Sequence, residues 1–222
     1  MSILEEHLNQ HCDPRLMGEL AYSVKEAYRF LWNLIESNPV LKNPEMRKSY
    51  GHLRQALVDV ALRLVLEESS VEANVQMVPA KNNKGGYTHT MIEVRGAIIS
   101  PSKTRSVQEM PRPALHRSQG SIKNRQFDLF TTQEDLNEKY DQNNPPYLLL
   151  TYGGSNHQLE FIQLGLPNIE AEKWIERVNI IDRPRVIDSP EKEVAIQKRL
   201  ELSLTELSAA LLRREQNGTG DI

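Results

Sequence analysis

The strongest constraint on this fold is a pair of strands in residues 71–99. Between residues 71 and 77 apolar and polar side chains alternate strictly: Val71, Ala73, Val75 and Met77 are separated by Glu72, Asn74 and Gln76. A period of two is typical of a strand with one buried and one solvated face. After a turn at 79–86, the second strand runs to Ile99 and places His89, Glu93 and Arg95 on one face. The buried face of this hairpin requires helices to cover it.

Helices are predicted on both sides of the hairpin in the sequence. Apolar residues recur at steps of three and four from residue 17 to residue 35, which predicts an amphipathic helix ending near Pro39. Residues 43–45 read Asn-Pro-Glu, the pattern of an N-cap, a first helical proline and an acid at the positive helix end, so a second helix should run to about Glu68. The short connection predicts an antiparallel helical hairpin. Residues 189–191, Ser-Pro-Glu, begin a C-terminal helix in the same way.

The rest of the chain predicts a second hairpin and two short helices. Strands are expected at 147–152 and 157–164, and short helices at 131–140 and from Asn168 onward, the latter burying Trp174. The predicted fold class is α+β: a helical hairpin and a C-terminal helix packed on a mainly antiparallel sheet of about four strands. We expect a single domain over residues 1–216 and a disordered tail at 217–222.

Composition excludes several classes of protein. At 222 residues, with 39% hydrophobic and 26% charged residues, the chain can bury a core without disulfides or structural metals. The net charge of -3 gives no overall attraction to anionic partners, so any such preference must be local. The single cysteine, Cys12, suits a reducing compartment. No leader pattern or long apolar run occurs, so a cytoplasmic location with no membrane contact is expected.

A basic segment at 101–126 provides the best functional signal. It contains a single acid, Glu109, and prolines at 111 and 113 exclude one continuous helix, so it is predicted to be a long loop. Its six cations are Lys103, Arg105, Arg112, Arg117, Lys123 and Arg125. Such a cluster is typical of phosphate contact, although it also fits a solvated loop or pairing with the chain's own acids. The first hypothesis is therefore a non-catalytic binding or regulatory protein that contacts nucleic acid.

Two other function classes remain open. The order of helix, hairpin and further strand resembles the restriction-endonuclease-like core, and Glu72, Glu93 and Arg95 on adjacent strands suggest a metal-dependent nuclease. That family requires Glu-x-Lys, whereas residues 93–95 are Glu-Val-Arg, and arginine cannot act as a base. The motif is thus degenerate, and no catalytic residue, cofactor or metal ligand is assigned.

The third hypothesis is a protein interaction module, such as a regulatory or antitoxin-like partner that binds an acidic protein surface. Its binding element would be the basic loop or the C-terminal helix. The apolar stripe of that helix comprises Ile196, Leu200, Leu204, Leu207 and Leu211. The stripe follows a period of 3.6, which favours closure of the core over self-association into a homo-oligomer.

Overall fold

A computed structural model describes residues 2–79, 88–128, 144–154, 158–187 and 189–217. Three predicted segments, the turn at 79–86, the short helix at 131–140 and the tail at 217–222, lie wholly or largely outside these residues. The fold is α+β, as predicted. Its elements in chain order are α1 (Ile3–His11), α2 (Leu16–Ser37), the 3-10 helix η1 (Pro44–Lys48), α3 (Tyr50–Glu68), β1 (Ala73–Pro79), β2 (Thr88–Val94), β3 (Ala97–Thr104), α4 (Leu115–Ser121), the 3-10 helix η2 (Ile122–Asp128), β4 (Tyr147–Gly153), β5 (Phe161–Pro167), β6 (Trp174–Asn179) and α6 (Pro190–Asn217).

The sheet is mixed and has six strands in the order β1-β2-β3-β4-β5-β6. All neighbouring strands are antiparallel except β3 and β4, which are parallel. The expectation of about four strands was too low for two reasons. The predicted second strand is divided by a tight turn at Gly96, whose φ of 83° favours glycine, so it forms both β2 and β3.

The second reason is that residues after Asn168 form a turn and strand β6, where a short helix was predicted. The Asn168 side chain accepts hydrogen bonds from the backbone N–H groups of Glu172 and Lys173, as an N-cap would, but the chain turns back toward β5. In turns and at helix N-caps alike, the asparagine side-chain oxygen accepts a hydrogen bond from a nearby backbone N–H, so the sequence does not distinguish the two, which explains the error. Trp174 begins the strand and lies against Gly165 of β5.

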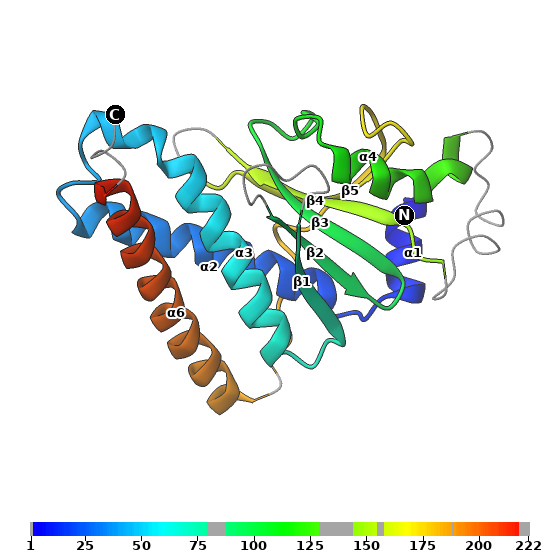
Figure 1. The fold of residues 1–222 in the computed structure, drawn as a ribbon. Coiled ribbons are helices and arrows are strands. Elements are labelled where there is room, and N and C mark those ends of the chain that lie inside the picture. The colour runs from blue at the N-terminus through cyan, green and yellow to red at the C-terminus, as the bar shows by residue number, and fades with distance from the viewer. Residues whose placement is uncertain (1, 80–87, 129–143, 155–157, 188, 218–222) are drawn as a thin grey trace.

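The sheet separates two layers of helix (Figure 1). Helices α1, α2, α3 and α6 lie on one face, where Leu20, Leu57, Ile92, Leu150 and Leu164 belong to the main core. The C-terminal helix packs along α3 and buries Ile196, Leu200 and Leu204, which confirms the prediction of core closure. Helix α4 and η2 cross the opposite face, over a smaller apolar cluster of Ile98, Tyr147 and Leu149. Among the described residues, no helix is both long and apolar enough to span a bilayer.

The prediction of a long loop over residues 101–126 was wrong. Strand β3 continues through Pro101 to Thr104, because it pairs along its length with the buried strand β4. The prolines at 111 and 113 do interrupt helix formation, but the chain becomes helical directly after them, at Leu115. Only residues 105–114 lack regular structure. We name the helical remainder, residues 115–128, the strap.

A half-buried acid on α3 leads to a prediction about pH. Asp59 faces β2 across a cavity of about 410 Å³, and burial raises the pKa of its carboxyl to about 7, partly opposed by a hydrogen bond with Thr90. The unfolded chain releases this proton near pH 4, so stability falls as the pH rises from about 4 to about 7. The variant Asp59→Asn mimics the neutral carboxyl. It should leave the free energy of unfolding unchanged below pH 4 and raise it by about 2 kcal/mol at pH 8, measured in urea.

The matched control is Asp182→Asn, since Asp182 is exposed. An equal effect of Asp59→Asn at both pH values would contradict the assignment of a raised pKa.

Candidate functional site

The structure places the six predicted cations on β3, on the connection after it and on the strap. Lys103 lies on β3 and Arg105 follows it; Arg112 precedes α4, Arg117 lies on α4, and η2 contains Lys123 and Arg125. All of them are exposed except Arg117, which is half-buried. They therefore form two groups, one beyond the carboxyl end of β3 and one on η2, with Arg117 between them in the sequence.

The group at the end of β3 gains a fourth member from α3. Arg54 is 4% exposed and its guanidinium lies 5.0 Å from the ring centroid of Tyr28. The pKa of Lys103 is lowered by partial burial and then by the positive charges of Arg54, Arg105 and Arg112. We call these four residues the cation cluster. Mutual repulsion of this kind is relieved when an anion binds.

The first turn of α3 also lies at the cation cluster. A Cβ atom on Gly51 would come within 3.1 Å of the Lys103 amine, so this amine lies close to the helix backbone. The N-terminal end of a helix bears a partial positive charge. The cluster thus adds to a potential that is already positive.

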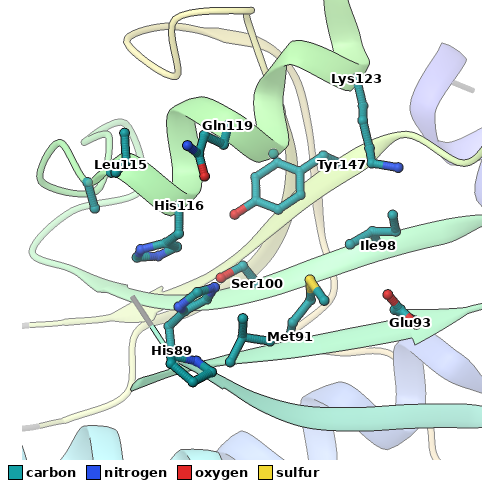
Figure 2. A pocket seen from close by; sticks show the side chains of 14 residues that line it. His89, Met91, Glu93, Ile98, Ser100, Leu115, His116, Gln119, Lys123 and Tyr147 are labelled. Atoms are coloured by element: carbon teal, nitrogen blue, oxygen red, sulfur yellow. The ribbon is translucent and has the colours of Figure 1, made fainter. Parts of the chain in front are cut away.

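A pocket of about 510 Å³ lies between the strap and the sheet (Figure 2). Strands β2 and β3 supply its floor through Met91, Ile98 and Ser100, and β4 supplies Tyr147. The strap covers it with Leu115, His116, Gln119, Gly120 and Lys123. Most of this lining is apolar, with a few polar groups at defined places, as in typical ligand sites.

Two histidines stack at one side of the pocket. The rings of His89 on β2 and His116 on α4 have centroids 3.9 Å apart and planes 17° apart (Figure 2). Burial lowers the pKa of both imidazoles, and the nearby Arg117 guanidinium lowers each of them further. The pKa of His116 falls to about 4. Both rings are therefore neutral at pH 7, and they present flat, polarisable surfaces.

Arg117 contacts the His116 ring and the elements beside it. Its guanidinium donates to the carbonyl of Arg112 through Nε (3.2 Å) and Nη2 (2.6 Å). Its Nη1 lies 3.4 Å from the Ser102 hydroxyl and 3.3 Å from His116 Nε2. Because a guanidinium can only donate, His116 Nε2 accepts and its proton is on Nδ1. Arg117 is thus a structural link between the strap and β3.

Tyr147 forms the back of the pocket, and the strap lies directly on it. A Cβ atom on Gly120 would come within 2.5 Å of the Tyr147 ring, so glycine permits this close approach. Burial raises the pKa of the Tyr147 hydroxyl, and the nearby Ser100 hydroxyl and the charge of Arg117 oppose that change. Asn124 of η2 is fully buried and bonds to the backbone of Tyr147 and Pro167.

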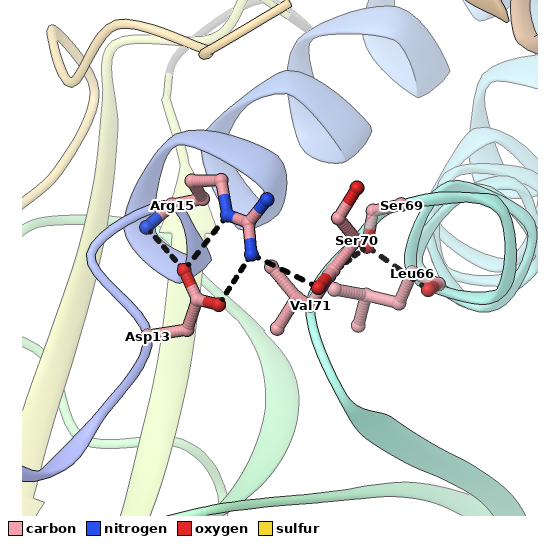
Figure 3. A network of polar contacts seen from close by, with 6 residues as sticks. All are labelled: Asp13, Arg15, Leu66, Ser69, Ser70 and Val71. Atoms are coloured by element: carbon pink, nitrogen blue, oxygen red, sulfur yellow. Dashed lines mark hydrogen bonds and ion pairs between the residues drawn. The ribbon is translucent and has the colours of Figure 1, made fainter. Parts of the chain in front are cut away.

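The acids that form ion pairs in the described part of the chain pair with other cations. In Figure 3 the Arg15 guanidinium makes two hydrogen bonds to the Asp13 carboxylate, of 3.0 and 2.9 Å, and donates to the carbonyl of Ser70 between α3 and β1. Further ion pairs use Arg29, Lys42, Arg183, Arg185 and Arg199.

The ion pairs among the described residues do not include Lys103, Arg105, Arg112 or Arg125. Near these cations, the Glu109 carboxylate accepts from the backbone N–H of Arg105, at 2.7 Å. Pairing with the chain's own carboxylates therefore does not account for these four side chains in the part of the chain described.

The residues of the nuclease hypothesis are arranged differently. His89 and Glu93 share one face of β2, as predicted, but Arg95, predicted on the same face, lies in the turn after β2. The Glu93 carboxylate accepts from the Asn74 amide at 3.4 Å. Within the described ranges, no three His, Cys, Asp or Glu side chains are grouped so that they could hold a metal ion.

Sequence reasoning missed Arg54, His116, Ser100, Tyr147 and Asn124 as parts of this site. Each comes from a different element, and local periodicity gives no signal that connects them. Comparisons with models of protein families, with curated proteins and with solved structures found no match.

Proposed function

We propose that this protein binds nucleic acid, without catalysis, through the cation cluster and the cations of the strap. The observation on which the proposal depends is the gathering of cations at the end of β3. The Lys103 amine lies close to Gly51 of α3, and its pKa is lowered first by partial burial and then by the positive charges of Arg54, Arg105 and Arg112. Phosphate groups are the biological anions that such clusters neutralise most often, with release of condensed counterions. Because the net charge of the chain is -3, the cluster attracts polyanions locally, while the surface as a whole does not attract them.

The two cation groups lie on opposite faces of the sheet. Side chains alternate along β3, so Ile98, beside Lys123 in Figure 2, faces the strap, whereas Lys103 faces α3 at Gly51. Arg105 and Arg112 lie on the connection between β3 and the strap, so a nucleic acid that contacts both groups must pass around the end of β3.

The location that fits this activity is the cytoplasm, which we include in the proposal. Cys12 is buried, and burial raises the pKa of its thiol to about 12. A thiol that stays protonated and buried is not available for disulfide exchange.

The test is the triple variant Lys103→Ala, Arg105→Ala, Arg112→Ala. Fluorescence anisotropy with a labelled 12-nucleotide single strand and a 12-base-pair duplex should show binding weakened by about 10- to 100-fold at 50 mM salt. The slope of log affinity against log salt should become shallower by about 2 to 3, because each lost phosphate contact removes about 0.7 to 0.9 from it.

The matched control removes three exposed lysines elsewhere: Lys25→Ala, Lys173→Ala, Lys198→Ala. It changes the net charge by the same amount, so it should reproduce only a small, nonspecific loss. Equal effects of the two triple variants, or no binding of either nucleic acid by the natural protein at low salt, would refute the proposal.

A further inference from the structure

We infer that the pocket beneath the strap takes one unstacked nucleobase of a single-stranded segment whose phosphates lie on the surrounding cations. This inference rests on the proposed function and extends it from the charged surface to a defined site. A volume of about 510 Å³ is large enough to hold a nucleobase and to admit part of its sugar.

The pocket lining matches the faces of a base. Met91, Ile98 and Leu115 supply apolar contact, and the imidazole of His116 lies parallel to that of His89 at the same opening (Figure 2). Stacking of bases on flat side chains is the usual means of holding single strands. Because the His116 pKa is about 4, this ring stacks as a neutral group and adds no charge at pH 7.

The polar groups of the pocket match the edges of a base. His89 lines one side of the pocket, and its Nδ1 atom is buried in the pocket wall. Gln119 on the strap lines the opposite side and offers both a donor and an acceptor. Glu93 is the acid among the described lining residues, and carboxylates accept hydrogen bonds from exocyclic amino groups of bases. Its negative charge also disfavours a phosphate inside the pocket.

Charges around the pocket specify where the phosphates lie. Lys123 stands at one end of the opening, as Figure 2 shows, and Arg125 follows it on η2. The cation cluster lies farther away, because Lys103 of β3 faces α3 on the other side of the sheet. A single strand whose phosphates contact Lys123 and Arg125 lies beside the pocket, where one base can turn inward. A duplex keeps its bases paired, so it can use the cations but not the pocket.

The experiment compares His116→Ala with the natural protein on a 12-nucleotide DNA single strand, on the same strand with all bases replaced by abasic sites, and on the corresponding duplex. Loss of the ring should weaken single-strand binding by roughly 5- to 100-fold. The salt slope should not change, because a neutral ring is removed. Binding of the abasic strand and of the duplex should be the same for both proteins.

Two controls separate stacking from folding. His116→Phe keeps a flat ring and should restore most of the single-strand affinity, and Trp32→Ala removes an exposed ring of α2 and should have no effect. The abasic strand tests the natural protein and so does not depend on a variant that folds. Unchanged single-strand affinity in His116→Ala, or equal binding of normal and abasic strands, would overturn the inference and leave the proposed function standing. Loss of salt-dependent binding in the natural protein would instead remove the proposed function.

Discussion

Replacement of Asn124 by alanine is expected to lower the free energy of unfolding by about 3 to 5 kcal/mol. The fully buried Asn124 amide donates to the carbonyls of Tyr147, at 2.8 Å, and Pro167, at 3.0 Å, and its carbonyl accepts from the backbone N–H of Tyr147, at 2.9 Å. The variant leaves three buried backbone groups without these bonds, and each such loss costs about 1 to 3 kcal/mol. Urea denaturation followed by circular dichroism measures the change.

The matched control for this prediction is Asn33→Ala, because Asn33 is exposed on α2 and its loss should cost less than about 0.5 kcal/mol. Asn124 joins η2 to β4 and β5, so the strap should also become easier to digest with trypsin in Asn124→Ala than in the control. A loss of stability below about 1 kcal/mol would show that the strap is held mainly by apolar contacts.

Replacement of Arg185 by alanine is expected to cost a similar amount, about 3 to 5 kcal/mol. Its guanidinium donates from Nε to Glu19 Oε2 at 2.8 Å, pairs with Glu193 at the start of α6 and lies 4.0 Å from the ring centroid of Tyr22. The side chains of Arg185 and Glu19 are only 10% and 5% exposed. Removal of one partner of a buried ion pair leaves a buried charge, which is strongly destabilising. Urea denaturation at pH 7 measures the loss.

Two further variants isolate the reason for this effect. Arg183→Ala breaks the more exposed pair with Glu5 and should cost at most about 1 kcal/mol. Adding Glu19→Gln to Arg185→Ala should recover part of the stability, because a neutral amide replaces the stranded carboxylate. If Arg183→Ala costs as much as Arg185→Ala, burial of the ion pair is not the cause.

The contacts that hold the strap on the sheet also position the proposed site. Asn124 and Arg117 hold the strap against β4 and β3, and the strap supplies both the cover of the pocket and two of the proposed phosphate contacts. Variants that loosen the strap should therefore weaken single-strand binding more than duplex binding. The cation cluster should be less affected, since Arg54 and Lys103 belong to α3 and β3.

The sequence by itself determined the class of the fold and much of its local structure. Alternation in residues 73–77 and 88–94 located β1 and β2, and helical spacing located α2, α3 and α6. The same rule assigned His89 and Glu93 to one face of β2. These features follow from the covalent geometry of a helix or strand, in which neighbours in sequence decide which side chains share a face.

Only the tertiary structure decided which other elements these helix and strand faces contact. Parallel pairing of β3 with β4, more than 40 residues later, placed the basic segment across the sheet. Packing of α3 on β3 brought Arg54 to Lys103, and packing of the strap on the opposite face brought His116 onto His89. Such contacts join elements whose separation no short pattern encodes, because strand partners are selected by packing of the whole core. The site is therefore a product of long-range pairing, although its charges are visible in the sequence.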